Sequence, residues 1–509
     1  MRGARGPGAL FGRAIIGASV AAILGGAAMV APSYAQDLPV TRLTLDNGMR
    51  FLVLPRPGAP TVSFVVRFDV GSANERPGET GVAHLLEHLL FKGSSSVGTT
   101  NWAVERRYLD RIDAAADSLE AARGGTPPEA GADTAEAARL LARVAALEDT
   151  ARAFVAPNEW VQLLVEQGAR GLNATTDVDA TTYFVELPSN RIELWFALEA
   201  DRMSDPVFRE FYTERDVVAE ERRLRVEDQS GGRLEQALLA AAYRVHPYGV
   251  PVIGHARDLG ALTRARVRAY HERYYGPNNA IVAVVGDVDE DAVAAYAERY
   301  FGRIPRRDEP PPVGRAEPPQ AAPRRAHVSF DAEPQVRLAW HTVTAGHPDA
   351  AALSVLASVL AGGTTSRLYK RLVLEDRSAL AVFAGGGPGA KFPGLMTISA
   401  APLAPHDNAA LEAAILEEVA RLAAAPPSER ELAAVRNQVE VGEVERLSSN
   451  LGLAFQLAAS ETLFDDWRAT FRATAELRAV TAEDVSRVAA AYLRAAAVTV
   501  ATLSREEEP

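Results

Sequence analysis

Two histidines and a glutamate interrupt a leucine-rich stretch near the start of the chain, GVAHLLEHLLFKGS at residues 81–94. On a helix, His84, Glu87 and His88 fall within an arc of about 100°, and the leucines take the other side. Two imidazoles one turn apart can ligate a single Zn²⁺, and a carboxylate beside them can take a proton from water that the metal activates. The spacing is HxxEH, the reverse of HExxH, and it predicts a metal centre with Glu87 as general base.

Four further segments follow this motif in a specific order. They are GLNATTDVDATTYF (171–184), ERDVVAEERR (214–223), HPYGVPVIG (246–254) and YYGPNNAIVAVVGDV (274–288). Together with EHLLFKGS, these segments closely resemble the motifs of the pitrilysin and insulinase (M16) family of zinc metallopeptidases, which includes the mitochondrial processing peptidases. The resemblance covers nearly the whole chain that follows the N-terminal 35 residues.

By this resemblance, the third zinc ligand is a glutamate on a downstream helix, and a second glutamate on the same face supports the site. The family pattern implies Glu221 as the ligand and Glu214, seven residues earlier, as the residue that orients a ligand histidine. Glu220 is the alternative ligand, because adjacent residues on a helix point about 100° apart and only one can face the metal. A run of solvated charges is the better interpretation of the arginines that follow Glu221, namely Arg222, Arg223 and Arg225.

The resemblance implies an endopeptidase that holds one Zn²⁺ per chain and hydrolyses unfolded peptides. It also implies that a strand over residues 171–185 pairs with the extended peptide at Asn173 and Ala174, through backbone hydrogen bonds. An ordinary sheet edge, rich in threonine, is the alternative interpretation of this strand. His246 is expected to be structural rather than a ligand.

Many relatives carry an arginine and a tyrosine, seven residues apart, soon after an SRL segment. Here, SRLYKRLVLEDRSALAV (366–382) places the apolar residues Val373 and Leu380 at those positions. The resemblance therefore implies a dimer, either with an unlike M16 subunit that supplies the pair or with a second copy. The alternative function is a non-catalytic or weakly active assembly subunit that retains zinc for structure.

The fold class implied is α+β, with two homologous halves that each contain a mixed or antiparallel sheet packed by helices. Residues 336–360 repeat the strand, turn and helix order of residues 62–90 without the histidines, which indicates a duplicated module. The N-terminal domain is expected over 36–303 and the C-terminal domain over 326–509. A proline-rich segment at 304–325 is the expected linker.

An insertion is expected within the N-terminal domain at about residues 102–157. Apolar residues recur there at spacings of three and four on both sides of the breaker GGTPPEAGAD (124–133), which predicts an antiparallel helical hairpin. The hairpin accounts for the long interval between His88 and Glu221. It is either a plain surface addition or an element that docks a partner or gates the cleft.

Composition narrows the remaining classes of protein. The formal charge of −12 argues against nucleic acid as a partner, and the absence of cysteine excludes disulfides and thiolate metal sites. The N-terminus has arginines, then an apolar run, then small residues before Gln36, which predicts a signal peptide cleaved after Ala35. An uncleaved anchor is the alternative. Export to the periplasm or the medium is therefore expected, with no membrane contact after cleavage.

Overall fold

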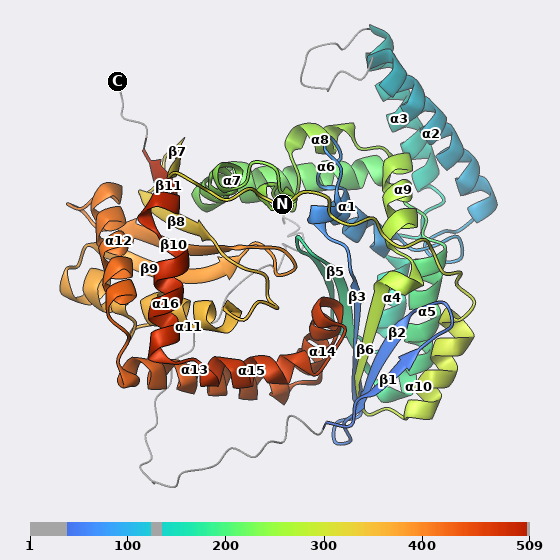
Figure 1. Cartoon of the computed structure of the whole chain (residues 1–509). Helices are drawn as coiled ribbons and strands as arrows, with labels where there is room; N and C mark the ends of the chain where they lie inside the picture. The colour runs from blue at the N-terminus through green and yellow to red at the C-terminus, as the bar shows by residue number, and fades with distance from the viewer. Residues whose placement is uncertain (1–37, 124–134, 506–509) are drawn as a thin grey trace, which may run out of the picture. The chain divides into compact units, whose positions relative to one another are not determined.

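The computed structural model describes residues 38–123 and 135–505, which contain two mixed β-sheets packed by helices (Figure 1). The first sheet has the strand order β1-β2-β6-β3-β5-β4, and the second has the order β7-β11-β8-β10-β9. The strands of the first sheet are β1 (Thr41–Thr44), β2 (Arg50–Pro55), β3 (Thr61–Phe68), β4 (Arg170–Thr176), β5 (Thr181–Pro188) and β6 (Ala280–Gly286). Those of the second are β7 (Arg324–Ser329), β8 (Gln335–His341), β9 (Ala379–Gly387), β10 (Leu395–Pro402) and β11 (Thr499–Ser504).

The two sheets repeat one topology. In the first, β2 and β6 are parallel, and the neighbours along β6-β3-β5-β4 are antiparallel. In the second, β7 and β11 are parallel, and the neighbours along β11-β8-β10-β9 are antiparallel. Helix α1 (Val82–Leu89) follows β3, and helix α11 (Ala350–Ala361) follows β8. The predicted α+β class with two homologous halves is confirmed.

Helices pack against both sheets, and the aromatic core of the first sheet lies on one of its faces. Phe64 of β3 stacks on Trp195, with ring centroids 4.1 Å apart. The helices of the N-terminal half beyond α1 are α2 (Trp102–Arg123), α3 (Ala135–Arg152), α4 (Glu159–Glu166), α5 (Ile192–Ser204), α6 (Phe211–Arg222), α7 (Ser230–Ala242), α8 (Ala256–Ala261), α9 (Arg264–Tyr274) and α10 (Glu290–Tyr296). Those of the C-terminal half beyond α11 are α12 (Asn408–Ala424), α13 (Glu429–Ser448), α14 (Asn450–Phe464), α15 (Ala469–Ala479) and α16 (Ala482–Tyr492).

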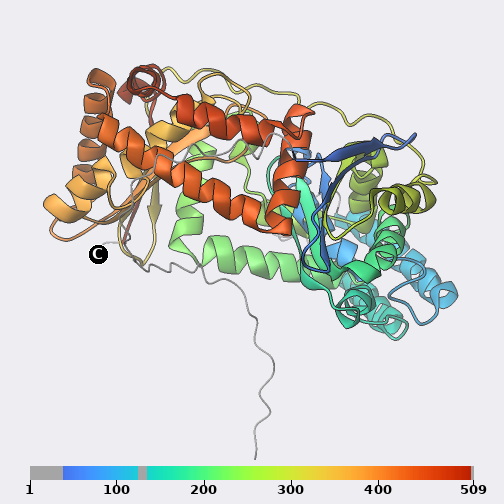
Figure 2. The ribbon, with the colours of Figure 1, turned by 90° about the horizontal axis from the view of Figure 1, so that it is seen from below.

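The C-terminal half contacts the N-terminal half through α14. This helix packs against β3 and β6 of the first sheet (Figures 1 and 2). Phe455 of α14 meets Phe184 of β5 edge to face, with ring centroids 4.9 Å apart. The first sheet is therefore covered by a helix that the chain adds more than 160 residues after the last strand of that sheet.

Two local predictions differ from the structure. The expected strand over 171–185 is a hairpin of β4 and β5, because the carboxylate of Asp177 accepts hydrogen bonds from the backbone N–H groups of Asp179 and Ala180 and so turns the chain. The periodicity of residues 190–229 also predicts one long helical region, but the structure interrupts it between α5 and α6, where Glu210 has a left-handed backbone at φ 55°. Both departures occur where a short polar turn replaces a continuous element.

The predicted helical hairpin is confirmed as α2 and α3, which lie side by side (Figure 1). Its turn, residues 124–133, lies outside the described residues. Glu105 of α2 accepts a hydrogen bond of 2.8 Å from Arg209, and both side chains are fully buried. Arg209 also donates to the carbonyl oxygens of the loop that follows α1, at Lys92, Ser94 and Val97. The insertion is therefore tied to the loop beside α1.

The expected linker separates the two predicted domains. Residues 305–323 of the expected linker contain no helix or strand, and β7 begins at Arg324, just inside the expected linker. The predicted signal peptide, with its cleavage after Ala35, lies outside the described residues. Among the described residues, none of the helices combines the length and the apolar character that crossing a bilayer requires.

Candidate metal centre

Helix α1 presents its polar side chains on one face. Its leucines are buried in the core of the N-terminal half, whereas His84, Glu87 and His88 keep part of their surface exposed. Two backbone N–H groups at the start of the helix donate to the carboxylate of Glu75, each over 2.9 Å. The apolar face and this anchored first turn together fix the direction in which the two histidines point.

Helix α6 brings Glu221 to the two histidines. Its Oε2 lies 3.5 Å from Nε2 of His88 and 3.9 Å from Nε2 of His84. Each of the three residues offers one ligand atom, and these atoms all lie within 4.8 Å of one another. The neighbouring Glu220 turns outward and pairs with Arg223 over 2.6 Å. The structure thus places Glu221, and not Glu220, at the imidazole pair.

The arrangement of these three side chains fits a zinc ion. Tetrahedral zinc with bonds of about 2.0–2.1 Å requires neighbouring ligand atoms to lie about 3.3 Å apart. The separation of 3.5 Å between His88 and Glu221 is close to that value, and small side-chain rotations close the rest. Two imidazoles and one carboxylate are also a donor set of catalytic zinc sites, which leave a fourth position open.

The two histidines differ in their charge. Burial and the neighbouring His88 lower the pKa of His84 to about 4, so its ring is neutral near neutral pH. Burial also disfavours the charged form of His88, but the carboxylates of Glu214 and Glu221 outweigh burial and raise the pKa of His88 to about 9. A divalent cation bound at this position would therefore have to displace a proton from His88.

Glu214 lies against the other ring nitrogen of His88. Its Oε2 is 3.5 Å from Nδ1 of His88, and its Oε1 is 2.5 Å from Nζ of Lys92. Lys92 also pairs with Glu210 over 3.2 Å. Although burial opposes it, these contacts with His88 and Lys92 lower the pKa of Glu214. The charged carboxylate can then accept a hydrogen bond from Nδ1 and leave Nε2 to face Glu221.

Glu87 lies on the same helix face as the ligand histidines. Thr176, the last residue of β4, donates a hydrogen bond of 2.5 Å from Oγ1 to Oε2 of Glu87. Burial raises the pKa of Glu87, and the hydrogen bond from Thr176 partly offsets this rise. A raised pKa brings a carboxyl group closer to the range in which it can both accept and return a proton.

Strand β4 ends beside this carboxylate and forms one edge of the first sheet. Within the described sheet, β4 pairs with β5 alone, so no other strand covers its second edge, and the N–H of Ala174 donates to Oδ1 of Asn173 over 2.9 Å. Asn173 and Ala174 lie opposite Phe184 and Tyr183 of β5. Pairing of this second edge with a peptide stays a prediction.

Three residues without a predicted role in the site contact its predicted residues. They are Lys92, Thr176 and Arg225. Lys92 lies in the motif EHLLFKGS and Thr176 in GLNATTDVDATTYF, so their places in these motifs could have indicated a role in the site. Arg225 was assigned to a solvated run, but its guanidinium pairs with Oε1 of Glu221 over 2.7 Å. Arg222 was assigned to the same run and is buried, because it turns inward and donates to Gln236 of α7. Arg225 stays exposed, as a solvated run predicts, whereas the burial of Arg222 contradicts that expectation.

The remaining predicted positions lie elsewhere in the fold. Val373 packs on the core of the C-terminal half, and Leu380 is exposed on β9. His246 is buried, and its Nδ1 accepts a hydrogen bond of 3.2 Å from the N–H of Tyr248. This bond gives His246 a structural contact.

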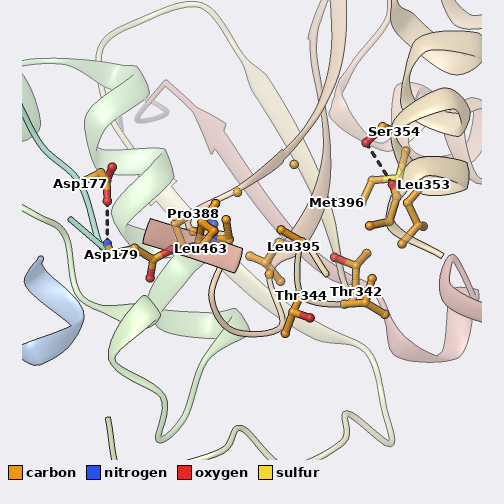
Figure 3. Close-up of a pocket in the computed structure, with 18 of the residues that line it drawn as sticks. Asp177, Asp179, Thr342, Thr344, Leu353, Ser354, Pro388, Leu395, Met396 and Leu463 are labelled. Carbon is orange, nitrogen blue, oxygen red and sulfur yellow. Dashed lines mark hydrogen bonds between the residues drawn. The ribbon is translucent and has the colours of Figure 1, made fainter. Parts of the chain in front are cut away.

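The second half has a different chemistry at the position that α1 occupies in the first. Aligning HLLEHLL (84–90) with SVLASVL (354–360) puts Ser354, Ala357 and Ser358 where the first half has its histidines and glutamate. A cavity of about 400 Å³ opens over this face of α11, next to the turn after β9 (Figure 3). Ser354 and Ala357 line the cavity, with Leu353, Leu395, Met396 and Leu463 among its apolar walls.

Known families match both halves of the chain. Residues 50–106 and 143–256 match the family described as Insulinase (Peptidase family M16), and residues 261–439 match the Peptidase M16 inactive domain. The first match skips residues 107–142, which belong to the α2–α3 hairpin.

Similar proteins support the same assignment. The zinc protease PqqE of Helicobacter pylori is 30% identical over 400 residues, which cover 73% of this chain and 75% of that protein. An uncharacterised zinc protease of Mycobacterium bovis is 29% identical over 89% of this chain and 91% of its own length.

Solved structures agree with these relatives. The crystal structure of a protease from Helicobacter pylori superposes with a TM-score of 0.76 at 25% identity, covering 91% of this chain and 99% of that chain. The M16 inactive domain structure from Pseudomonas fluorescens superposes with a TM-score of 0.73 at 17% identity, covering 93% of this chain and 100% of that one. With its two matched halves and the HxxEH helix in the first of them, this chain belongs to the M16 family of insulinase-type peptidases.

Proposed function

We propose that this chain is a zinc-dependent endopeptidase that hydrolyses unfolded peptides. The observation that carries the proposal is the convergence of His84, His88 and Glu221 within 4.8 Å, with Glu87 on the same face of α1. His84, His88 and Glu221 would hold one Zn²⁺ per chain. When bound, the ion lowers the pKa of a water molecule and polarises the scissile carbonyl group.

Glu87 is the group that moves the proton. Its carboxylate accepts a proton from the attacking water and then returns it to the amine that leaves. The hydroxyl of Thr176 holds Oε2 of Glu87 over 2.5 Å and so sets the direction in which the carboxylate faces. Because burial raises its pKa, Glu87 can take the proton and still release it within one turnover.

The second edge of β4 is the proposed peptide-binding element. An extended peptide that pairs with β4 near Asn173 and Ala174 would gain backbone hydrogen bonds on the side of the sheet next to Glu87. Backbone pairing tolerates many side chains but requires an extended chain. The proposal therefore favours unfolded peptides over folded proteins as substrates.

A partner subunit completes the proposed enzyme. At the positions where many relatives have the arginine and tyrosine, this chain has Val373 and Leu380, neither of which can donate a hydrogen bond from its side chain to a peptide. We therefore favour a dimer with an unlike M16 subunit that supplies the pair. A homodimer is the simpler alternative.

Turnover of a quenched fluorescent peptide tests the proposal. The purified chain should cleave the peptide faster with a candidate partner than alone, and a chelator should abolish cleavage until zinc is restored. A chain that binds stoichiometric zinc but cleaves nothing in either assay would support the second candidate, an assembly subunit with structural zinc. Full activity of the chain alone would remove the need for an unlike partner.

Export is the remaining part of the proposal. It rests on the arginines, the apolar run and the small residues that precede Gln36. N-terminal sequencing of the protein recovered from the periplasm or medium of the native host should begin at Gln36. Recovery of the intact N-terminus from the membrane fraction would favour the uncleaved anchor.

A further inference from the structure

A second cavity, of about 430 Å³, lies between the inserted hairpin and the helices next to it. Its walls come from α2, α6, α8 and the start of α9, together with a glycine that precedes α1. We call it the arginine pocket. The lining residues are Gly78, Ala116, Leu119, Glu120, Arg123, Tyr212, Arg215, Arg257, Asp258, Gly260, Ala261, Leu262, Thr263 and Arg266.

The arginine pocket carries a surplus of positive charge. Among the described residues, four arginines and two carboxylates line it, and one of these arginines, Arg123, already has a partner. Both carboxylates already have partners, since Glu120 pairs with Arg266 over 2.6 Å and Asp258 accepts a hydrogen bond of 2.7 Å from Thr80. Arg257 is exposed, and among residues 38–123 and 135–505 it has no hydrogen bond or ion pair. A guanidinium group without a partner carboxylate at a cavity is available to an anion from outside the chain.

A second cation in the pocket is held in place mainly by uncharged groups. Arg215 stacks over the ring of Tyr212 at 4.9 Å and donates to the carbonyl oxygen of Gly260 over 3.3 Å. Its nearest carboxylate, Asp216, is 3.6 Å away and mostly exposed. These contacts restrain the Arg215 side chain but leave other N–H groups of its fork to donate elsewhere.

Part of the remaining wall is apolar. Leu119 and Ala116 of the hairpin and Leu262 before α9 are buried, as is most of the Tyr212 side chain. A bare inorganic ion would leave this apolar surface and most of the 430 Å³ unused, whereas a ligand of ordinary metabolite size would fill it. The pocket therefore combines a cationic rim with an apolar interior.

We propose that the arginine pocket binds a small organic anion, in which a carboxylate or phosphate group is attached to an apolar body. The anionic group pairs with Arg257 and Arg215, and the apolar body lies against Leu119 and Leu262. None of His84, Glu87, His88, Glu214 or Glu221 lines this pocket, so its occupancy requires neither zinc nor turnover.

Calorimetric titration of the full chain with 4-phenylbutyrate tests the proposal. The same titration with the uncharged amide of this acid isolates the contribution of the charge, and titration with inorganic phosphate isolates that of the apolar body. We expect 4-phenylbutyrate to bind at least about tenfold more tightly than either comparison compound. If phenyl phosphate binds as well as the carboxylate, the site accepts both anionic groups.

Charge reversal at the rim supplies the matched control. Arg257→Glu should weaken binding of 4-phenylbutyrate by at least about tenfold, because it replaces an attractive charge with a repulsive one. Arg268→Glu makes the same change at an exposed arginine of α9 that does not line the cavity, and it should leave binding unchanged. Arg257→Gln removes the charge without reversing it and should lie between Arg257→Glu and the unmodified chain.

Several outcomes would overturn the proposal. They are absence of heat from 4-phenylbutyrate with the folded, unmodified chain, equal binding of the amide, and equal weakening by the substitutions at Arg257 and Arg268. Since all titrations can be repeated after zinc is removed, their result is independent of whether the chain proves to be a peptidase.

Discussion

Helices α1 and α11 occupy equivalent places in two sheets of one topology, but only α1 carries groups that can bind a metal. In α11, the hydroxyls of Ser354 and Ser358 donate to carbonyl oxygens one turn earlier in their own helix, each over 3.1 Å. Ala357 stands where α1 has Glu87. The fold is therefore stable with either set of side chains, and the chemistry depends on a few substitutions at one helix face.

The comparison also shows what the metal centre needs beyond its own helix. In the first half, α6 adds Glu221 and Glu214, which both contact His88, and β4 adds Thr176, which donates to Glu87. Among the described residues, His84, His88 and Glu221 are the only cluster of potential metal ligands found. The second half retains the scaffold, and the cavity over its α11 is lined by both apolar and polar residues, including Asp177 and Asp179 of the first half (Figure 3).

The largest effect is expected from removing the carboxylate of Glu87, which has no counterpart at Ala357 of α11. Glu87→Gln should lower peptide hydrolysis by at least about a hundredfold, because an amide cannot take the proton from water. Zinc content should remain one per chain, because Glu87 is not among the ligands. Rates of peptide cleavage with metal analysis of the same sample check both statements. Glu79→Gln, just before α1, is the matched control, and near-normal activity of Glu87→Gln would contradict the assignment.

The next largest effect is expected on the amount of zinc that the chain retains. Glu221→Gln should lose most of the bound zinc, because the amide oxygen is a weaker ligand than a carboxylate oxygen. Glu220→Gln should keep the zinc, because Glu220 faces Arg223. Elemental analysis of both variants after gel filtration gives the answer. A reversed order of zinc loss would move the ligand to Glu220.

A smaller effect is expected from the lysine that supports Glu214. Lys92→Met should weaken zinc binding by about tenfold, which is the lower end for residues that orient a metal ligand. The reason is that Glu214 loses its 2.5 Å partner and holds His88 less firmly. Competition with a fluorescent chelator measures the change. Lys370→Met, at an exposed lysine of the C-terminal half, should leave the affinity unchanged, and equal weakening would assign the effect to charge alone.

The last expected effect, counted for a change of one pH unit, is a dependence of zinc affinity on pH. The pKa of His88 is raised to about 9, so below that pH zinc must displace one proton, and above it none. Zinc affinity should therefore rise by up to about tenfold for each pH unit until about pH 9, and then level off. In Glu214→Gln, the plateau should begin at lower pH, because one of the carboxylates that raise the pKa is gone. A flat profile below pH 9 would contradict the charge assigned to His88.

Much of this arrangement could be predicted from the sequence, because it depends on local periodicity. The leucines of HLLEHLL determine the face to which the histidines belong, and the spacing of seven between Glu214 and Glu221 places both on one stripe of a helix. The repeated order of strand, turn and helix predicted the second half. These properties follow from 3.6 residues per turn and need no tertiary information.

The remainder depends partly on local side-chain contacts that a sequence pattern does not single out, and partly on residues far apart in the chain. Arg225 lies four residues after Glu221 and is both exposed and paired with it, and the pattern of charges alone does not distinguish such a pair from a solvated run. The hairpin of β4 and β5 depends on the side chain of Asp177 competing for backbone N–H groups. The bond from Thr176 to Glu87 spans 89 positions, and no periodicity reports it.

The buried pair of Glu105 and Arg209 limits how the insertion can be removed. Excising residues 104–156 would delete Glu105 and leave the Arg209 guanidinium without its counter-charge in a fully buried place, a loss that typically costs about 3–5 kcal/mol. A change in activity would then reflect damage to the loop beside His88, and it would not reveal the function of the hairpin. A shortened chain should therefore keep the first turn of α2. The inner end of the insertion thus supports the loop next to the candidate site. Changes in the length of its outer end should be tolerated more easily than loss of the whole insertion.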